Sequence, residues 1–449
     1  MIDLFADTIC AISSPLGKGG VSLIRVSGTK AIEIVSLIFS RKNLGALESN
    51  KVVYGSIINK NTREVIDEVL LTIFREPKSY TMEDVIEISC HGGIVVTNLV
   101  LQEIINAGAR LALPGEFTKR AYLNGRISLV EAESINDLIN AKNELSVYLS
   151  NNRKGFVDTL NSYYISLIEI NASLEVKIDY PEFFESLDSD TDIYSIKQKV
   201  ISINEKIKVE IKNSLKKKII RDGVNCAIVG SPNVGKSSLL NSFLGFNKAL
   251  VSNLPGTTRD IVEGSIAYKG FSFNFFDTAG IRNTKNQIEE LGINKTNEMI
   301  ENSDIILFVR ENKVSKNDFL IKNKIKNLNY IEIINKADLF TSRDEKDALY
   351  VSAINNTGTL EILDLIIKKA NLFEVKDKIK YINNERVSNL LYLIGDNLDE
   401  IIKLIDSNQN LDMIILELKD SLHKFEEILG TNFVEDTFSN IFKNFCVGK

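Results

Sequence analysis

Residues 230–237 read Gly230-Ser231-Pro232-Asn233-Val234-Gly235-Lys236-Ser237, which is the pattern G-x-x-x-x-G-K-S. An apolar run at 226–229 precedes this stretch and an amphipathic run at 238–244 follows it, so the sequence predicts a strand, a glycine-rich loop and a helix. This is the context of a phosphate-binding loop, in which backbone N–H groups and the helix N-terminus converge on phosphate oxygens. Lys236 supplies a positive charge for the outer phosphates, and the Ser237 hydroxyl is suited to bind Mg²⁺.

Two further stretches are placed to respond to a terminal phosphate. Thr257-Thr258-Arg259-Asp260 follows the loop, and one of its threonines can close over Mg²⁺ when a γ-phosphate is present. Asp277-Thr278-Ala279-Gly280 follows the β-rich run 271–276. Asp277 can hold Mg²⁺ through a water molecule, and the Gly280 N–H can contact the γ-phosphate.

Two more stretches predict the choice of base. Asn335-Lys336-Ala337-Asp338 follows the apolar run 330–334, and Ser352-Ala353 follows Tyr350-Val351. The Asp338 carboxylate can accept two hydrogen bonds from the N–H edge of guanine, which adenine does not offer. Ser352-Ala353 can complete the base pocket through its backbone. A turn or a helix cap could explain each motif alone, but the ordered set predicts a GTP-binding domain.

The residue that usually orients the attacking water is missing. Ras-like GTPases carry a glutamine directly after Asp-x-x-Gly, and here that position is Ile281. Arg259 and Arg282 lie nearby, but neither is an obvious arginine finger. Glu289 and Glu290 are candidates for positioning the water, and the alternative for both is a solvated helix start.

Composition restricts the class of protein. The chain has 449 residues, of which 44% are hydrophobic and 25% charged, so we expect a globular, soluble protein with two or three domains. Its net charge of -6 gives no overall basic signature for nucleic acid. The apolar runs are too short to span a membrane, and the first residues do not read as a secretory signal. Four dispersed cysteines and two histidines exclude a disulfide framework and a histidine-rich metal site, and they favour a reducing cytoplasm.

We predict a multidomain fold class that combines α/β and all-α parts. Residues 1–118 should form an N-terminal α/β domain, with β-rich runs at 8–14, 21–27, 52–58, 69–74 and 85–90 and helices near 30–39 and 94–107. Glycine clusters at 17–20 and 92–93 favour turns over ligand contacts. Residues 119–220 and 375–449 should form two parts of one helical domain, because apolar stripes at 390–405 and 411–429 need helical partners. Residues 221–374 should form an inserted, doubly wound α/β GTPase domain.

The chain resembles the MnmE (TrmE) family of tRNA-modification GTPases over essentially all of its length. The most specific motifs lie outside the GTPase motifs. They are Gly17-x-Gly19-Gly20-Val21 with Arg25 and Ser27-Gly28, Ser79-Tyr80-Thr81-x-Glu83-Asp84, His91-Gly92-Gly93, Pro114-Gly115-Glu116-Phe117-Thr118-x-Arg120-Ala121 and Phe445-Cys446-Val447-Gly448-Lys449. Other GTPases with the same core, such as ribosome-assembly GTPases, lack this N-terminal domain and this tail.

The resemblance implies an activity that composition does not indicate. Family members work with a flavin-dependent partner, MnmG (GidA), which carries FAD. Together they build a carboxymethylaminomethyl or aminomethyl group on carbon five of the wobble uridine in certain tRNAs. A tetrahydrofolate on the N-terminal domain, which also mediates homodimerisation, supplies the one-carbon unit. The residues that match the folate site are Arg25, Glu87, Arg126 and Lys449, with Arg126 standing where a lysine is common.

The resemblance also implies a solution to the missing glutamine. GTPase domains of the family dimerise in a potassium-dependent way, and K⁺ takes the role of an arginine finger. The matching K⁺ ligands are Asn233, Ser252, Leu254 and Thr257, and the matching Mg²⁺ ligands are Ser237 and Thr258. The catalytic candidates are Lys236, Glu289 (or Glu290 in the alternative register) and Cys446, although a cysteine near a chain end is usually inert. The full nucleotide-binding set is Asn233, Val234, Gly235, Lys236, Ser237, Ser238, Ser252, Asn253, Leu254, Pro255, Gly256, Thr257, Thr258, Asp277, Thr278, Ala279, Gly280, Asn335, Lys336, Asp338, Ser352 and Ala353.

Two other functions stay open at this point. The chain could be a ribosome-assembly or translation-associated GTPase switch without folate chemistry, which binding of 5-formyl-tetrahydrofolate would distinguish. It could also be a helical scaffold with a degenerate nucleotide domain, which the intact Lys236, Ser237 and Asp277 argue against.

Overall fold

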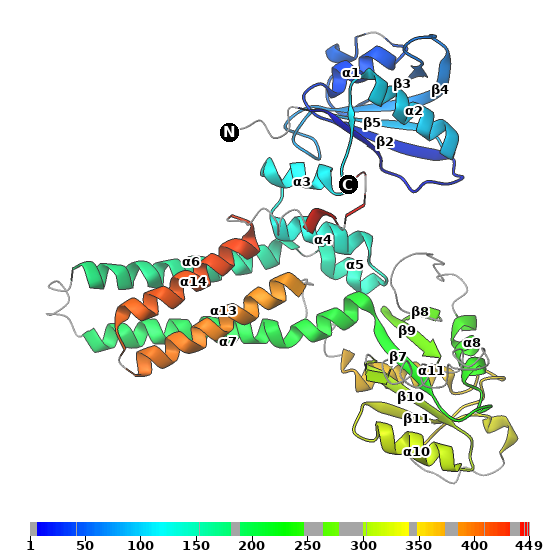
Figure 1. The fold of residues 1–449 in the computed structure, drawn as a ribbon, viewed down its shortest axis with the longest axis vertical. Helices are drawn as coiled ribbons and strands as arrows, with labels where there is room; N and C mark the ends of the chain where they lie inside the picture. The colour runs from blue at the N-terminus through cyan, green and yellow to red at the C-terminus, as the bar shows by residue number, and fades with distance from the viewer. Residues whose placement is uncertain are drawn as a thin grey trace, which may run out of the picture. The chain divides into compact units, whose positions relative to one another are not determined.

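The computed structural model separates into two compact units, and we treat each unit by itself. The first comprises Met1–Asn136, Val157–Asn171 and Lys419–Lys449, and the second comprises Asp137–Phe156 and Ala172–Leu418. The structure describes residues 7–41, 43–151, 153–180, 189–246, 264–277, 300–301, 303–340, 348–372, 385–407, 409–431, 441–443, 445–446 and 448. Figure 1 labels the elements used below.

A six-stranded sheet forms the centre of the first unit. Its strands are β1 (Ile9–Ile12), β2 (Val21–Ser27), β3 (Lys51–Ile58), β4 (Val65–Phe74), β5 (Val85–His91) and β6 (Arg110–Leu111). Their order is β3-β4-β5-β2-β1-β6, antiparallel except for the β1–β6 pair. Helices α1 (Ala31–Ile38) and α2 (Ile94–Ala107) bury their apolar stripes in one core with the sheet (Figure 1). Alternating burial along β4 places every second side chain in that core, as the period of a strand requires.

Glycines in this unit occupy positions where a side chain would be strained or would clash. Gly108 ends α2 with a φ of 125°, a conformation in which a side chain would be strained. The two glycine clusters lie against each other, because a Cβ on Gly92 would stand 2.1 Å from the Gly19 carbonyl oxygen. The Gly92 N–H also donates to the Gly20 carbonyl at 3.3 Å. The glycines in these two segments therefore allow the two backbones to lie in close contact.

Helices complete the first unit. They are η1 (Leu44–Ala46), α3 (Glu116–Leu123), most of α4 (Leu129–Ile139), and the parts of α6 (Arg153–Asp179) and α14 (Leu411–Leu429) that belong to it. The Tyr164 hydroxyl of α6 donates to Glu426 of α14 at 3.0 Å, and its ring lies beside Phe425. A helix from before the nucleotide-binding region thus packs on one from after it.

The second unit contains a doubly wound sheet. Its strands are β7 (Val224–Val229), β8 (Gly264–Tyr268), β9 (Phe271–Asp277), β10 (Ile305–Arg310), β11 (Tyr330–Ile334) and β12 (Leu349–Tyr350), in the order β12-β11-β10-β7-β9-β8. All neighbours are parallel except β8 and β9. Its helices are α8 (Lys236–Phe246), α10 (Lys316–Ile325), η4 (Ala337–Leu339) and α11 (Thr359–Lys369).

Both faces of this sheet are covered. Ile305, Leu307 and Val309 of β10 share a core with α8 and α11, whereas Ile306 and Phe308 share another with α10. The continuous apolar run of β10 is the pattern expected of a strand that is buried on both faces.

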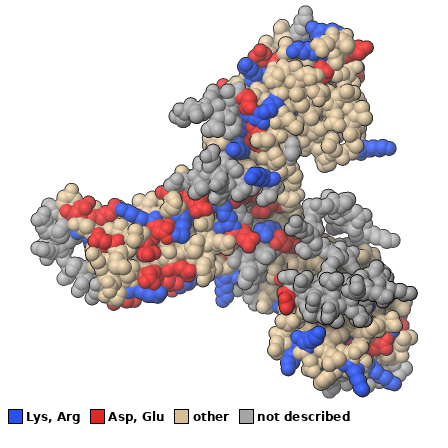
Figure 2. Space-filling model, in the orientation of Figure 1, with Lys and Arg blue, Asp and Glu red and all other residues tan. Residues whose placement is uncertain are grey.

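Helices α5 (Glu144–Asn151), α7 (Ser189–Asp222) and α13 (Glu385–Asp406) lie wholly within the second unit as well. Lys197 pairs with Asp406, and Lys208 pairs with Asp399, so α7 and α13 run antiparallel. On the face that Figure 2 shows, basic side chains on the long helices are interspersed with acidic ones. Among the described helices, none has the length and apolar character needed to cross a membrane.

The predicted elements agree closely with the observed ones. The predicted strands at 21–27 and 85–90 and the helix at 94–107 correspond to β2, β5 and α2, and the stripe at 411–429 is α14. The prediction missed β6 and α3, and it missed the first residues of β4, where acidic residues interrupt the apolar pattern. The multidomain fold class with α/β and helical parts is confirmed. The domain boundaries at 118, 220 and 374 stay a prediction.

Candidate functional site

The phosphate-binding loop lies at the carboxyl end of β7. A Cβ on Gly230 would stand 2.0 Å from the Val309 carbonyl oxygen, so this position accepts glycine alone without movement of the backbone. Gly235 has a φ of 91°, and a Cβ there would stand 2.3 Å from Asn335 Nδ2. Each glycine of the motif therefore answers a steric requirement of the fold.

Lys236 begins α8 and is held against the loop. Its Nζ donates to the carbonyl oxygens of Gly230 at 3.0 Å and Ser231 at 2.9 Å, and the residue is 7% exposed. Ser237 and Ser238 follow it in the first turn of α8, and both are exposed. Asn233, with a φ of 64°, is also exposed. The loop thus presents a cation, hydroxyls and a helix N-terminus together.

Asp277 is the last residue of β9. In the parallel pairing of β7 with β9, Ile228 lies opposite Asp277. The carboxyl ends of both strands therefore meet at one edge of the sheet, where doubly wound folds bind their ligands.

Asn335 joins the base-recognition motif to the phosphate-binding loop. The residue is 2% exposed, and its Nδ2 donates to the Val234 carbonyl at 2.9 Å. Its Oδ1 accepts from the Ala353 N–H at 3.2 Å. The three segments that contain Val234, Asn335 and Ala353 are thereby fixed to one another, although they lie far apart in the sequence.

Lys336 and Asp338 flank the turn that follows. Lys336 has a φ of 64° and forms an ion pair with Glu311. Asp338 is exposed within η4 and accepts a hydrogen bond from the Ser352 hydroxyl. An exposed carboxylate whose orientation is set by a neighbouring hydroxyl suits recognition of two N–H donors on a base.

Several predicted site residues lie outside the described part of the chain. They are Ser252, Asn253, Leu254, Pro255, Gly256, Thr257, Thr258, Thr278, Ala279, Gly280, Glu289, Glu290 and Lys449. Their proposed roles rest on the sequence.

A cavity of about 670 Å³ lies in the first unit beside three of the predicted folate residues. Glu87 and Arg126 line it together with Tyr80. Arg126 stacks over the Tyr80 ring at 4.8 Å and donates to the Tyr80 carbonyl at 2.7 Å. Arg25 does not line the cavity; it donates to Glu87 Oε1 through Nη2 at 2.6 Å and Nε at 3.0 Å, and so orients that carboxylate.

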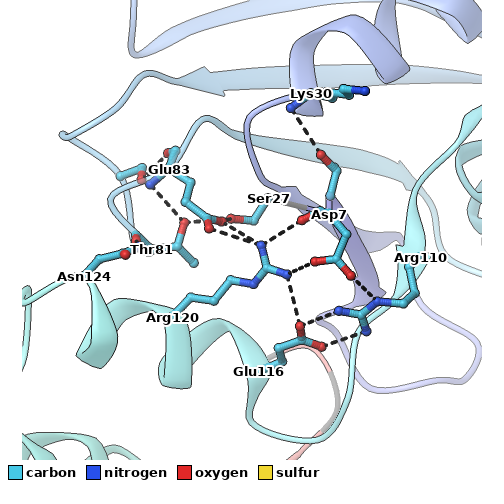
Figure 3. Close-up of polar contacts among 11 residues, drawn as sticks. Asp7, Ser27, Lys30, Thr81, Glu83, Arg110, Glu116, Arg120 and Asn124 are labelled. Carbon is cyan, nitrogen blue, oxygen red and sulfur yellow. Dashed lines mark hydrogen bonds and ion pairs between the residues drawn. The ribbon is translucent and has the colours of Figure 1, made fainter. Parts of the chain in front are cut away.

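A buried ion cluster supports this part of the unit (Figure 3). Arg120 is fully buried and donates to Glu83, Glu116 and the Asp7 carboxylate at 2.9–3.1 Å. Arg110 bonds to Asp7 and Glu116 as well. The bond from Arg120 to Glu83 connects α3 to the segment that carries Tyr80. Removing one partner of the cluster would leave a buried charge uncompensated.

The C-terminal tail is seated on the first unit. The Gly115 N–H donates to the Cys446 carbonyl at 3.4 Å, and the Ser13 hydroxyl donates to the Gly448 carbonyl at 3.0 Å. Gly115 has a φ of 68°, and a Cβ there would stand 2.8 Å from the Phe442 carbonyl oxygen. Cys446 is exposed.

Sequence reasoning missed two contributors to these sites. Tyr80 lies within a quoted motif, but its contact with Arg126 depends on tertiary structure. The contact between Ser231 and Asp318 joins residues 87 positions apart. The spacing of Ser315 and Asp318 could have indicated a helix capping box, which the structure contains.

Comparison with known proteins places these sites in a family. The sequence profile described as "GTP-binding protein TrmE N-terminus" matches residues 8–126, and the one described as "MnmE helical domain" matches residues 129–446. The chain belongs to the MnmE family. A tRNA modification GTPase MnmE from Fervidobacterium nodosum is 38% identical, and the alignment covers 100% of this chain and 98% of that protein. MnmE relatives from Aster yellows witches'-broom phytoplasma and Prochlorococcus marinus are 36% and 38% identical, with 99% of this chain covered in each case and 100% and 98% of the relative.

Membership of the MnmE family confirms the predicted resemblance and the predicted GTPase class. Membership also supports binding of GTP, whereas the assignment of the phosphate-binding loop and the base motif to that nucleotide stays a prediction.

Proposed function

We propose that the chain hydrolyses GTP and, with a flavoprotein partner, installs a carboxymethylaminomethyl or aminomethyl group at carbon five of the wobble uridine in certain tRNAs. One observation carries the proposal: Asn335 joins a guanine-recognition motif to a phosphate-binding loop in a chain that is similar to tRNA modification GTPases along its whole length. GTP turnover drives conformational change and does not supply energy to the uridine directly.

At the nucleotide, Ser237 and Thr258 would hold Mg²⁺ and Asp277 would hold it through water. The exposed Ser237 hydroxyl at the start of α8 and the position of Asp277 at the adjacent strand end fit a Mg²⁺–phosphate group. A bound Mg²⁺ neutralises charge on the outer phosphates.

Potassium would supply the charge that an arginine finger supplies elsewhere. Its proposed ligands are Asn233, Ser252, Leu254 and Thr257, and the exposed position of Asn233 within the phosphate-binding loop fits that role. Glu289 would position the water.

We expect GTP turnover to be at least about tenfold faster in KCl than in NaCl at equal ionic strength. The Asn233→Ala variant should lose this difference and still bind GDP. Equal rates in the two salts would overturn the potassium proposal.

The cavity in the first unit would hold a tetrahydrofolate derivative. Its volume suits a small-molecule cofactor. The Glu87 carboxylate can accept from the N–H edge of a pterin, and Arg126 can pair with a carboxylate. Bound tetrahydrofolate supplies the one-carbon unit, with Lys449 and Cys446 as further candidates near it. Calorimetry with 5-formyl-tetrahydrofolate tests the cavity, and a Glu87→Ala variant should bind at least about tenfold more weakly.

We further propose that the chain acts in the cytoplasm as a homodimer with the flavoprotein MnmG.

The proposed function can be tested in cells that lack the gene. Bulk tRNA from these cells is digested and its nucleosides are profiled by mass spectrometry. Loss of the aminomethyl-type wobble uridines, restored by wild type and by Lys269→Ala but not by Lys236→Ala, is the expected result. Lys269 is a matched control because it pairs with Asp364 on the surface of the same unit. An unchanged profile would favour a ribosome-assembly GTPase.

A further inference from the structure

A hydroxyl of the phosphate-binding loop is bonded to a buried carboxylate on a helix outside the nucleotide motifs. Ser231 Oγ donates to Asp318 Oδ1 at 2.5 Å, and the two residues are 8% and 2% exposed. The other oxygen, Oδ2, accepts from the Ser315 N–H at 2.8 Å and the Ser315 hydroxyl at 2.7 Å. Asp318 therefore uses one oxygen to cap α10 and the other to hold the loop.

The bond between Ser231 and Asp318 is charge-assisted. Burial raises the pKa of Asp318, but hydrogen bonds from Ser231 and Ser315 outweigh burial and leave that pKa below its ordinary value. Asp318 is therefore ionised at neutral pH, and a hydroxyl that donates to a carboxylate makes a stronger bond than one that donates to a neutral group.

Ser231 also contacts Lys236, so the bond to Asp318 restricts the surroundings of that lysine. The Ser231 carbonyl accepts from Lys236 Nζ, as does the carbonyl of Gly230, where an added Cβ would stand 2.0 Å from the Val309 carbonyl oxygen. The start of the loop is thus held on one side by the Asp318 carboxylate and on the other by β10. Since a preorganised loop loses less conformational freedom when it closes around phosphate, the constraint should favour binding.

We propose that Asp318 is a positioning residue that acts through Ser231 to hold the phosphate-binding loop in its nucleotide-binding conformation. The loop contacts phosphates shared by GDP and GTP, so the constraint strengthens binding of both. This proposal concerns nucleotide binding alone and is independent of the tRNA and folate chemistry.

The alternative is that Asp318 does no more than cap α10. The two roles use different carboxylate oxygens, so separate variants distinguish them. Ser231→Ala removes the hydrogen bond between the loop and Asp318 Oδ1 and keeps the capping box of α10. Ser315→Ala removes the serine of that capping box and keeps the hydrogen bond from Ser231 to Asp318. Ser315 Oγ also lies 3.2 Å from Ser231 Oγ, but that contact is between neutral groups and is the weaker one.

The experiment measures binding of N-methylanthraniloyl-GDP to the full chain by fluorescence, with thermal melting of each variant alongside. We expect Ser231→Ala to raise the Kd about five- to tenfold, mainly through faster release, and Ser231→Thr to restore it to within about twofold. Ser315→Ala should lower the Tm and change the Kd less than about twofold. Asp318→Ala should raise the Kd at least as much as Ser231→Ala does. The variant that combines both substitutions should have the same Kd as Asp318→Ala alone, because the two residues act through one bond.

Steady-state GTP hydrolysis gives the second readout. Because the constraint acts on groups bound equally in the ground and transition states, Ser231→Ala should raise KM and change kcat less than about twofold. An unchanged Kd in Ser231→Ala, or an equal rise in Ser315→Ala, overturns the proposal. If Asp318→Ala does not fold, the comparison of Ser231→Ala with Ser315→Ala still decides it.

Discussion

We expect a single side chain, that of Asp338, to determine which base this chain accepts. The Asp338 carboxylate is exposed, and the Ser352 hydroxyl orients it. A carboxylate offers only acceptors, whereas the amide of asparagine offers one acceptor and one donor. The base that fits position 338 therefore depends on whether its edge presents two donors, as in guanine, or a donor and a carbonyl, as in xanthine.

The Asp338→Asn variant should exchange one base for the other. We expect its affinity for GTP to fall about 100-fold or more, because a polar group of the base is left unpaired, and its affinity for XTP to rise. Competition between labelled GDP and each triphosphate measures both changes. Asp364→Asn, on the surface of the same unit, serves as the control and should bind GTP like wild type. Unaltered base preference in Asp338→Asn would contradict this assignment.

Glu116 should make stability depend on pH. Burial raises the pKa of Glu116, but hydrogen bonds from Arg110, the Leu113 N–H and Arg120 outweigh it and leave the pKa below its ordinary value. The contribution to stability is therefore complete above the unfolded pKa of about 4.3 and is lost as the pH falls through the folded value. Glu116→Gln should lose about 3–5 kcal/mol at pH 7 and show a shallower acid dependence.

Urea unfolding of the full chain at pH 7 and pH 4 measures this effect. The matched control is Glu48→Gln, whose carboxylate is exposed and 3.7 Å from Lys51. It should change the unfolding free energy by less than about 0.5 kcal/mol. A steep acid dependence that persists in Glu116→Gln would assign it to other carboxylates.

At the scale of elements, the turn from β7 to α8 is sensitive to one methyl group. Gly235→Ala places a Cβ 2.3 Å from Asn335 Nδ2 at a φ of 91°, so loop or base motif must shift. We expect nucleotide affinity to fall by at least about tenfold, since strain and the lost Asn335 bond act together. The control is Gly245→Ala, at a position within α8 where a Cβ would meet open space; it should bind nucleotide as wild type does, with stability raised by about 1 kcal/mol. Equal affinities in both alanine variants would refute the steric argument.

Sequence predicted these elements well where local chemistry determines them. The β-rich run at 21–27 predicted β2, and the helix predicted near 94–107 is α2. The prediction missed β6 because it has only two residues, and it missed α3 because that helix buries the polar residues Glu116, Thr118 and Arg120 and so lacks an apolar stripe. The motifs named Asn335, but its bonds to Val234 and Ala353 are tertiary contacts that no local pattern contains. The buried bonds of Asp318 and Arg120 escaped for the same reason.

At the scale of the whole molecule, sequence segments and packing units do not coincide. Leu145 and Leu149 of α5 precede the nucleotide motifs by many residues, yet they share the core of the nucleotide-binding sheet. The side chain of Asn143 donates to the Ile220 carbonyl at 2.8 Å, and the Ser272 hydroxyl of β9 donates to the Lys142 carbonyl at 2.9 Å. The nucleotide-binding sheet therefore depends on a helix from the predicted helical domain.

Leu149→Ala should weaken the nucleotide-binding unit although it lies far from the motifs in sequence. The side chain is 1% exposed, so its truncation should cost about 2–5 kcal/mol and lower the temperature at which labelled GDP is released. Tyr148→Ala, on the same helix and 71% exposed, is the matched control and should leave that temperature nearly unchanged. Equal release temperatures in wild type and Leu149→Ala would show that α5 does not support the sheet.

The packing of the C-terminal tail against residues near the N-terminus has a consequence for folding during synthesis of the chain. Ser13 and Gly448, joined by a hydrogen bond, are 435 positions apart. At about 5–20 residues per second, a ribosome needs roughly 20–90 seconds to progress from one to the other. From the synthesis of Gly115 until the tail is made, the surface around Gly115, against which Phe442 and Cys446 later pack, stays uncovered on the nascent chain. The first unit therefore completes its packing only after residues 442–448 have been synthesised, although its sheet ends at Leu111.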